Sequence, residues 1–157
     1  MTPKYTELLI SLAKLLGAQT EVMDETTVLE IEHEDVLLVV YPHPDKAAMV
    51  LEAQICEIDA LADPFTQMER LLMLHKVNDL ARLTHGAVGT ISEDNMLLLG
   101  HTLPLETTTV PLLLETLDTL LGHAVHLRQA WTGSWNVFEQ LDDDNKFNAT
   151  PPGVQMV

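Results

Sequence analysis

Seven histidines and a single cysteine are the side chains in this sequence with the most capacity for chemistry. His123 and His126 lie three positions apart, so on a helix both could bind one metal ion. Zinc requires roughly three or four ligands, and this pair has no histidine, cysteine or carboxylate nearby to complete a set. The pair is more typical of a helix surface, so we predict no metal site and no cofactor.

Cys56 is a second candidate, because a cysteine beside a histidine base can act as a nucleophile. The local sequence that accompanies catalytic cysteines in known families is absent around it. A small, buried, hydrophobic role is therefore favoured for Cys56. His75 lies among apolar residues of an expected helix, which indicates a hydrogen-bonded core or interface histidine.

The clustered carboxylates also have an ordinary explanation. Glu30 and Glu32 alternate along an expected strand, so both belong to its solvated face. Asp142 to Asp144 lacks the spacing, the glycine and the distal glutamate of a calcium loop. We find no phosphate-binding glycine loop, serine nucleophile elbow or metalloprotease helix. The sequence therefore predicts no catalytic residues and no enzyme.

The charge balance excludes several kinds of partner. The chain has 157 residues, of which 24 are acidic and 8 are basic, giving a net charge of −16. Such a protein repels phosphate backbones, so nucleic acid is not an expected partner. No apolar run approaches the roughly 18 residues of a membrane span, so no membrane insertion is expected. One cysteine and no recognisable signal peptide favour the cytoplasm.

Periodicity predicts a helix followed by three strands in the first part of the chain. The helix covers about residues 4–16, and its expected core stripe is Tyr5, Leu8, Leu9, Leu12, Leu15 and Leu16. Strands are expected at 27–32, 36–41 and 49–56, with a turn at His33-Glu34. The second of these is continuously apolar, which is typical of a strand covered on both faces.

A helix, a hairpin and a last helix are predicted in the second part. Asp63-Pro64 begins the first of these helices, which runs to about Thr84. The hairpin is expected at 87–91 and 96–103, and the last helix at about 107–128. We expect one domain over residues 1–131 and a flexible acidic C-terminal tail over 132–157.

The sequence is more hydrophobic than one small core requires. The helix from Asp63 carries apolar residues on most of its sides, and one sheet face cannot cover them all. Surplus apolar surface on a highly charged protein normally marks a protein interface. The alternative is that these residues simply fill the core of one chain.

In this order of elements the chain resembles the class I type III secretion chaperones, the CesT/SycE-like small acidic proteins that escort bacterial effectors. The resemblance covers about residues 4–131. It is carried by the opening helix (5–17), the Leu-rich run that closes on an asparagine (71–78), the hairpin (86–105) and the Leu-rich last helix. A YbjN-like family of acidic single-domain proteins has a similar pattern.

The resemblance implies an α+β fold: a twisted, mostly antiparallel five-stranded sheet with three helices in the order α-β-β-β-α-β-β-α. It also implies a homodimer that binds the N-terminal segment of a secreted effector in extended form and passes it to the secretion ATPase. The alternative function is a YbjN-like, non-secretory protein-interaction or regulatory module on the same fold.

Two sets of residues are expected to form the binding surfaces. The self-complementary dimer interface is expected on the helix from Asp63, at Met68, Leu72, His75 and Asn78. An effector-binding groove is expected between the first helix and the first two strands, at Leu9, Ile10, Ala13, Val28, Val36 and Leu38. An exposed strand edge beside the groove could add main-chain hydrogen bonds to the peptide.

Overall fold

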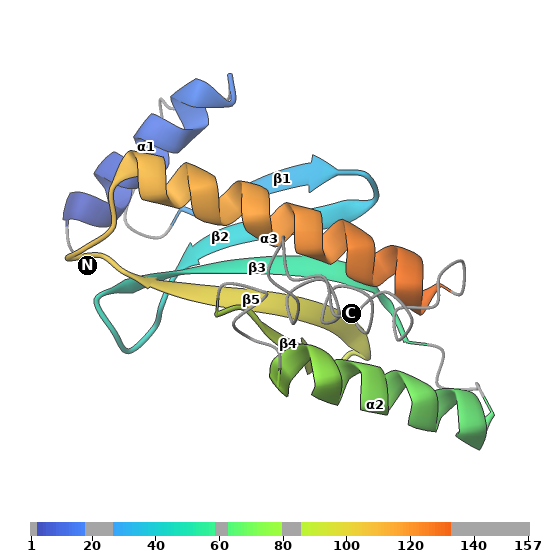
Figure 1. Ribbon diagram of the computed structural model, residues 1–157. Coiled ribbons are helices and arrows are strands. Elements are labelled where there is room, and N and C mark those ends of the chain that lie inside the picture. Colours follow the sequence, from blue (N-terminus) through green and yellow to red (C-terminus); the bar gives the residue numbers. More distant parts are fainter. Residues whose placement is uncertain (1–2, 18–26, 59–62, 80–85, 133–157) are drawn as a thin grey trace, which may run out of the picture.

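The structure is a computed structural model that describes residues 3–17, 27–58, 63–79 and 86–132. The elements follow in the order α1 (Pro3–Leu15), β1 (Leu29–His33), β2 (Val36–Pro42), β3 (Ala48–Glu57), α2 (Pro64–Asp79), β4 (Val88–Ile91), β5 (Met96–Pro104) and α3 (Val110–Trp131). The strands form one antiparallel sheet in the order β1-β2-β3-β5-β4 (Figure 1). The predicted fold class and element order are confirmed.

The first hairpin is one residue away from its expected position. His33 pairs with Val36, so the turn consists of Glu34 and Asp35. Both have positive φ, at 48° and 62°, as a two-residue hairpin of the mirror-image type I′ requires. The expected turn at His33-Glu34 is therefore wrong by one position, because the strand continues through His33.

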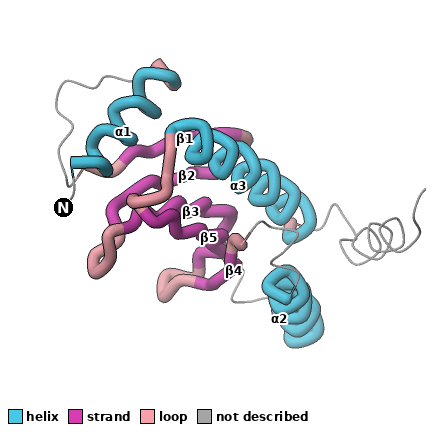
Figure 2. Tube along the Cα trace, turned by 60° about the vertical axis from the view of Figure 1, so that its left-hand side comes forward, coloured by secondary structure: helices cyan, strands magenta, loops and turns pink. Residues whose placement is uncertain are grey.

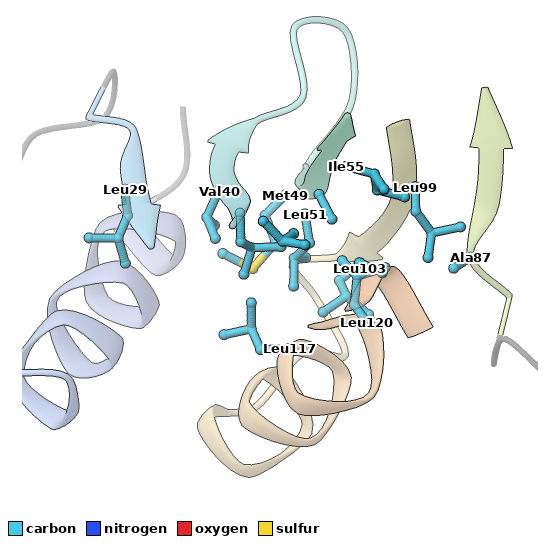
Figure 3. Packing of buried hydrophobic residues seen from close by; sticks show 14 of the residues in the cluster. Leu29, Val40, Met49, Leu51, Ile55, Ala87, Leu99, Leu103, Leu117 and Leu120 are labelled. Atoms are coloured by element: carbon cyan, nitrogen blue, oxygen red, sulfur yellow. The ribbon is translucent and has the colours of Figure 1, made fainter. Parts of the chain in front are cut away.

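The hydrophobic core lies between one face of the sheet and helices α1 and α3 (Figures 1 and 3). On the sheet it is formed by alternate residues of the strands, which share one face as the pleat requires. These include Val36, Leu38, Val40, Met49, Leu51, Ala53, Ile55, Leu97, Leu99 and Leu103. From α3 they meet Leu113, Leu117, Leu120, Ala124 and Leu127.

The opposite face of β2 is less covered than its apolar sequence indicates. Leu37, Val39 and Tyr41 alternate with the buried residues and remain partly exposed. The expected covering of both faces is therefore not seen in a single chain. Figure 2 shows α1 and α3 together on one side of the strands.

Helix α1 matches its predicted stripe in its first three turns. Tyr5, Leu8, Leu9 and Leu12 are at most 5% exposed. Ala13 is also fully buried, which the predicted stripe omitted, because it lies one turn after Leu9 on the same face. In contrast, Leu15 and Leu16 are 61% and 49% exposed, so their assignment to the stripe is wrong: Leu15 is the last residue of the helix and Leu16 follows it.

Helix α3 is capped at its N-terminus by Thr109. The Thr109 side chain accepts a hydrogen bond from the backbone N–H of Leu112, and Pro111 lies in the first turn. The helix continues to Trp131, which is only 4% exposed and belongs to the core cluster. The predicted tail over 132–157 lies, apart from Thr132, outside the described residues.

No helix in the described part of the chain is long and apolar enough to cross a membrane.

Candidate protein-binding surfaces

The outer side of α2 is the largest exposed apolar feature of the described residues. Asp63 caps the helix: its carboxylate accepts hydrogen bonds from the backbone N–H of Phe65 and of Thr66 and from the Thr66 hydroxyl. Beyond the cap, the exposed residues are Phe65 (72%), Met68 (60%), Leu71 (56%) and Leu72 (54%). We call these four residues the α2 apolar surface. Exposed apolar surface of this kind normally marks a protein interface.

The residues predicted for the dimer interface fall into two groups. Met68 and Leu72 belong to the α2 apolar surface, and His75 is also exposed, with its Nε2 3.3 Å from an Asp79 carboxylate oxygen. Asn78 is partly buried and faces its own chain. Three of the four predicted residues are therefore available to a second subunit.

Asn78 fastens α2 to the edge strand β4. Its side-chain nitrogen donates to the Gly89 carbonyl at 2.9 Å, and its side-chain oxygen accepts from the Gly89 N–H at 2.7 Å. Both backbone groups of Gly89 are thus satisfied by one side chain. A Cβ at Gly89 would lie 2.5 Å from the Leu74 Cδ1, so the absence of a side chain allows this close approach.

We expect Asn78→Ala to lower the free energy of unfolding by about 2–4 kcal/mol, because it leaves two partly buried backbone groups without partners. Equilibrium denaturation in urea measures this loss. Asp79→Ala, at the exposed neighbouring position, is the control and should change stability by less than about 0.5 kcal/mol. Equal stabilities for the two variants would contradict this assignment.

Four of the six residues predicted for the effector groove lie in the core. Leu9, Ala13, Val36 and Leu38 are each 0% exposed. In this structure they belong to the core cluster and present no surface to a peptide. The reason is the strand phase: Val36 and Leu38 are on the face that α1 and α3 cover.

Ile10 and Val28 are the two predicted groove residues that remain accessible. Ile10 is partly buried on α1, and Val28 is 47% exposed immediately before β1. Tyr5 holds these two segments together, since its hydroxyl donates to the Thr27 carbonyl at 2.7 Å. Among the described residues, strand β1 forms one edge of the sheet. Its outer side could therefore pair with an added strand.

The histidines, the acidic side chains and Cys56 are the side chains that the sequence analysis considered for chemistry. No group of three or more histidine, cysteine or acidic side chains in the described residues could hold a metal ion. Burial raises the pKa of the Cys56 thiol, against the opposing charges of Arg128 and Arg70. A thiol with a raised pKa is a poorer source of thiolate at neutral pH. This is the reactivity expected of a structural cysteine.

An arginine pair near the end of β3 was missed by the sequence analysis. The register between β3 and β5 shifts between Gln54 and Cys56, which leaves Ile55 without a partner on β5. The Arg128 guanidinium reaches across from α3 and donates to the Ile55 carbonyl at 2.6 Å. Arg70 of α2 lies over the Trp131 ring, 5.7 Å from its centroid. The only signal in the sequence was the scarcity of basic residues, which does not reveal where they meet.

The architecture is that of a small α+β protein with an open antiparallel sheet and an apolar helix beside its edge strand β4. The chain belongs to the Tir chaperone protein (CesT) family, which it matches over residues 7–128. The resemblance found in the sequence is confirmed. Comparison with curated proteins finds no match.

Solved structures share the fold at low sequence identity. A chain in the crystal structure of the ExsC-ExsE complex is 20% identical, with a TM-score of 0.67 over 82% of this chain and 94% of that chain. A chain in the HopA1-SchA chaperone-effector complex is 17% identical, with a TM-score of 0.64 over 81% and 94%. A third match is to the complex of the Yersinia pestis type III secretion chaperone SycH with a fragment of YscM2, at 20% identity and a TM-score of 0.59 over 78% and 98%.

Proposed function

We propose that this protein is a cytoplasmic, homodimeric type III secretion chaperone that binds the N-terminal segment of an effector in extended form. The family match over residues 7–128 is the observation that carries this proposal. The matched structures include complexes described as chaperone with effector, which supports an effector as the partner. The function is binding, and no residue is assigned a catalytic role. The released effector segment would then pass to the secretion ATPase.

The effector surface is proposed to lie where α1 meets β1. Ile10 and Val28 offer apolar side chains there, and the outer edge of β1, which pairs with no other strand of the described residues, offers backbone groups to an extended peptide. Glu30 and Glu32 are exposed on β1. Their charges favour basic effector segments, so the association rate should fall as salt screens them.

The test is the double substitution Ile10→Asp and Val28→Asp. Each substitution removes an apolar contact and adds a like charge to an acidic surface, so we expect at least about a hundredfold weaker binding of the effector's N-terminal fragment. The partner is first identified by mass spectrometry of proteins that the tagged wild-type chain captures in its native host. Calorimetry with the purified N-terminal fragment then measures the dissociation constant.

Leu112→Asp is the matched control, because Leu112 is an exposed leucine (39%) on α3 and belongs to neither of the two segments that form the proposed surface. It should bind the fragment like the wild type. A folded double variant with unchanged affinity would contradict the proposed surface. If the wild-type chain captures only proteins that are not secreted, the YbjN-like interaction module becomes the better assignment.

A further inference from the structure

Among the described residues, the sheet has two edge strands, β1 and β4, and only one of them carries charge. Glu30 and Glu32 are exposed on β1, and like charges oppose the pairing of β1 with a second copy of itself. Strand β4 has no charged residue, and its Val88 and Ile91 are 48% and 38% exposed. An uncharged edge strand rich in β-branched residues is a template for pairing with another chain. Strand β4 therefore needs another form of protection.

The backbone groups of Gly89 point away from the sheet. In an antiparallel pair, residues that bond across the pair alternate with residues whose N–H and C=O groups point outward. The Ser92 N–H bonds across the hairpin to the Met96 carbonyl at 2.9 Å. By this alternation, Ile91 and Gly89 direct their backbone groups outward, in the register that pairs Gly89 with Leu99. These are the groups that an added strand would bond.

The Asn78 carboxamide occupies the outward position at Gly89. Its nitrogen donates to the Gly89 carbonyl at 2.9 Å, and its oxygen accepts from the Gly89 N–H at 2.7 Å. A carboxamide presents a donor and an acceptor side by side, as a neighbouring strand does. Helix α2, which carries Asn78 next to its last residue, lies beside β4 (Figures 1 and 2). One side chain thus stands where a sixth strand would bond.

We propose that Asn78 closes the β4 edge against a second copy of this chain. Without the carboxamide, the last turn of α2 is released from β4, and the β4 strands of two copies pair antiparallel about a two-fold axis. This pairing matches Gly89 of one copy with Ile91 of the other, so the outward-facing groups of both residues are bonded. A second copy is the expected occupant, because this edge is self-complementary in shape and meets no like charge on its own copy.

The test compares the mass of Asn78→Ala with that of the wild type by analytical ultracentrifugation, from micromolar to millimolar concentration. At physiological ionic strength the Debye length is about 8 Å, so the net charge of −16 is screened beyond the contact. Pairing through β4 should raise the weight-average mass toward about twice the wild-type value, whatever assembly the wild type forms.

Ile91→Pro tests whether the β4 edge is the contact. It removes an outward-facing N–H and no bond to β5, and proline is tolerated on edge strands. The double variant N78A/I91P should return to the wild-type mass, and I91P alone should keep that mass.

Leu120→Ala controls for a general loss of stability. Leu120 is 2% exposed on α3, so its truncation removes core contacts and leaves the β4 edge unchanged. This variant should keep the wild-type mass.

Amide hydrogen exchange followed by NMR locates the contact at individual residues. In dilute Asn78→Ala, the Gly89 N–H has lost its acceptor and should exchange at least about tenfold faster than in the wild type. At high concentration, the N–H groups of Gly89 and Ile91 should become protected together, because both bond to the second copy.

Several results would overturn the proposal. One is a wild-type mass for Asn78→Ala at every concentration. An equal increase in mass for Leu120→Ala would assign the association to lost stability. An increase that survives Ile91→Pro, or protection that appears at other amides and not at Gly89, would place the contact elsewhere. No effector enters these measurements, so their outcome is independent of the proposed chaperone function.

Discussion

Charges placed on the α2 apolar surface should convert the proposed homodimer to monomers. The substitutions are Met68→Asp and Leu72→Asp, at positions 60% and 54% exposed in the single chain. A two-fold interface buries each residue twice, and each buried Met or Leu contributes about 1.5–3 kcal/mol. We therefore expect the dimer dissociation constant to rise by at least about a thousandfold. Analytical ultracentrifugation should give twice the 17.5 kDa chain mass for the wild type and the chain mass for the variant.

Because Met68 and Leu72 are exposed in the single chain, their substitution should affect dimerisation without unfolding the protein. Substitutions at exposed helix positions usually change stability by less than about 0.5 kcal/mol each, so the variant should keep its circular dichroism spectrum. Leu112→Asp on α3 again serves as the control and should remain dimeric. A wild-type chain that sediments as a monomer at micromolar concentration would refute the proposed homodimer.

A second large effect is expected from Val36→Asp, which should remove a large part of the free energy of unfolding at pH 7. Val36 is 0% exposed and lies in the core cluster. The substitution loses the apolar contact and buries a charge without a partner, which costs at least about 4 kcal/mol. Natural domains have a total stability of only about 5–15 kcal/mol. Urea denaturation with circular dichroism detection measures the loss.

Val28→Asp is the matched control, because the same change is made eight positions earlier at a side chain 47% exposed. It should change stability by less than about 1 kcal/mol. Burial raises the pKa of a carboxyl at position 36 in the folded state. The loss in free energy of unfolding, relative to the control, should therefore shrink as the pH falls toward the pKa of aspartate in the unfolded chain, which is roughly 4. Similar stabilities for both variants at pH 7 would place Val36 at the surface.

The sequence predicted the elements well because their signals are local. The alternation from Met49 to Ile55 matched the buried face of β3, and Asp63-Pro64 marked the start of α2. The faces of β2 were harder to predict, because Val36 to Tyr41 is apolar throughout and contains no alternation. Four predicted groove residues consequently lie in the core. Which face of an apolar strand is covered depends on helices far away in the sequence.

The polar contacts were not predictable for a different reason. Asn78 is eleven residues from Gly89, and Arg128 is 73 residues from Ile55. Each pairing depends on how separate elements pack, and neither leaves a periodic pattern. The family resemblance drew attention to Asn78 as the end of a Leu-rich run. The structure shows it bound to its own chain rather than directed outward.

The attachment of α2 has a consequence for the lifetime of the protein in the cell. Only Met73 and Leu74 of this helix are buried, and the Asn78–Gly89 contact adds two hydrogen bonds. A helix held by so few contacts opens at a lower free energy than the sheet does. In an unassembled chain, α2 should therefore be the first segment cut by cellular proteases. Because the proposed dimer would cover this helix, chains that have not yet dimerised should be degraded first, and degradation would remove the unassembled chains.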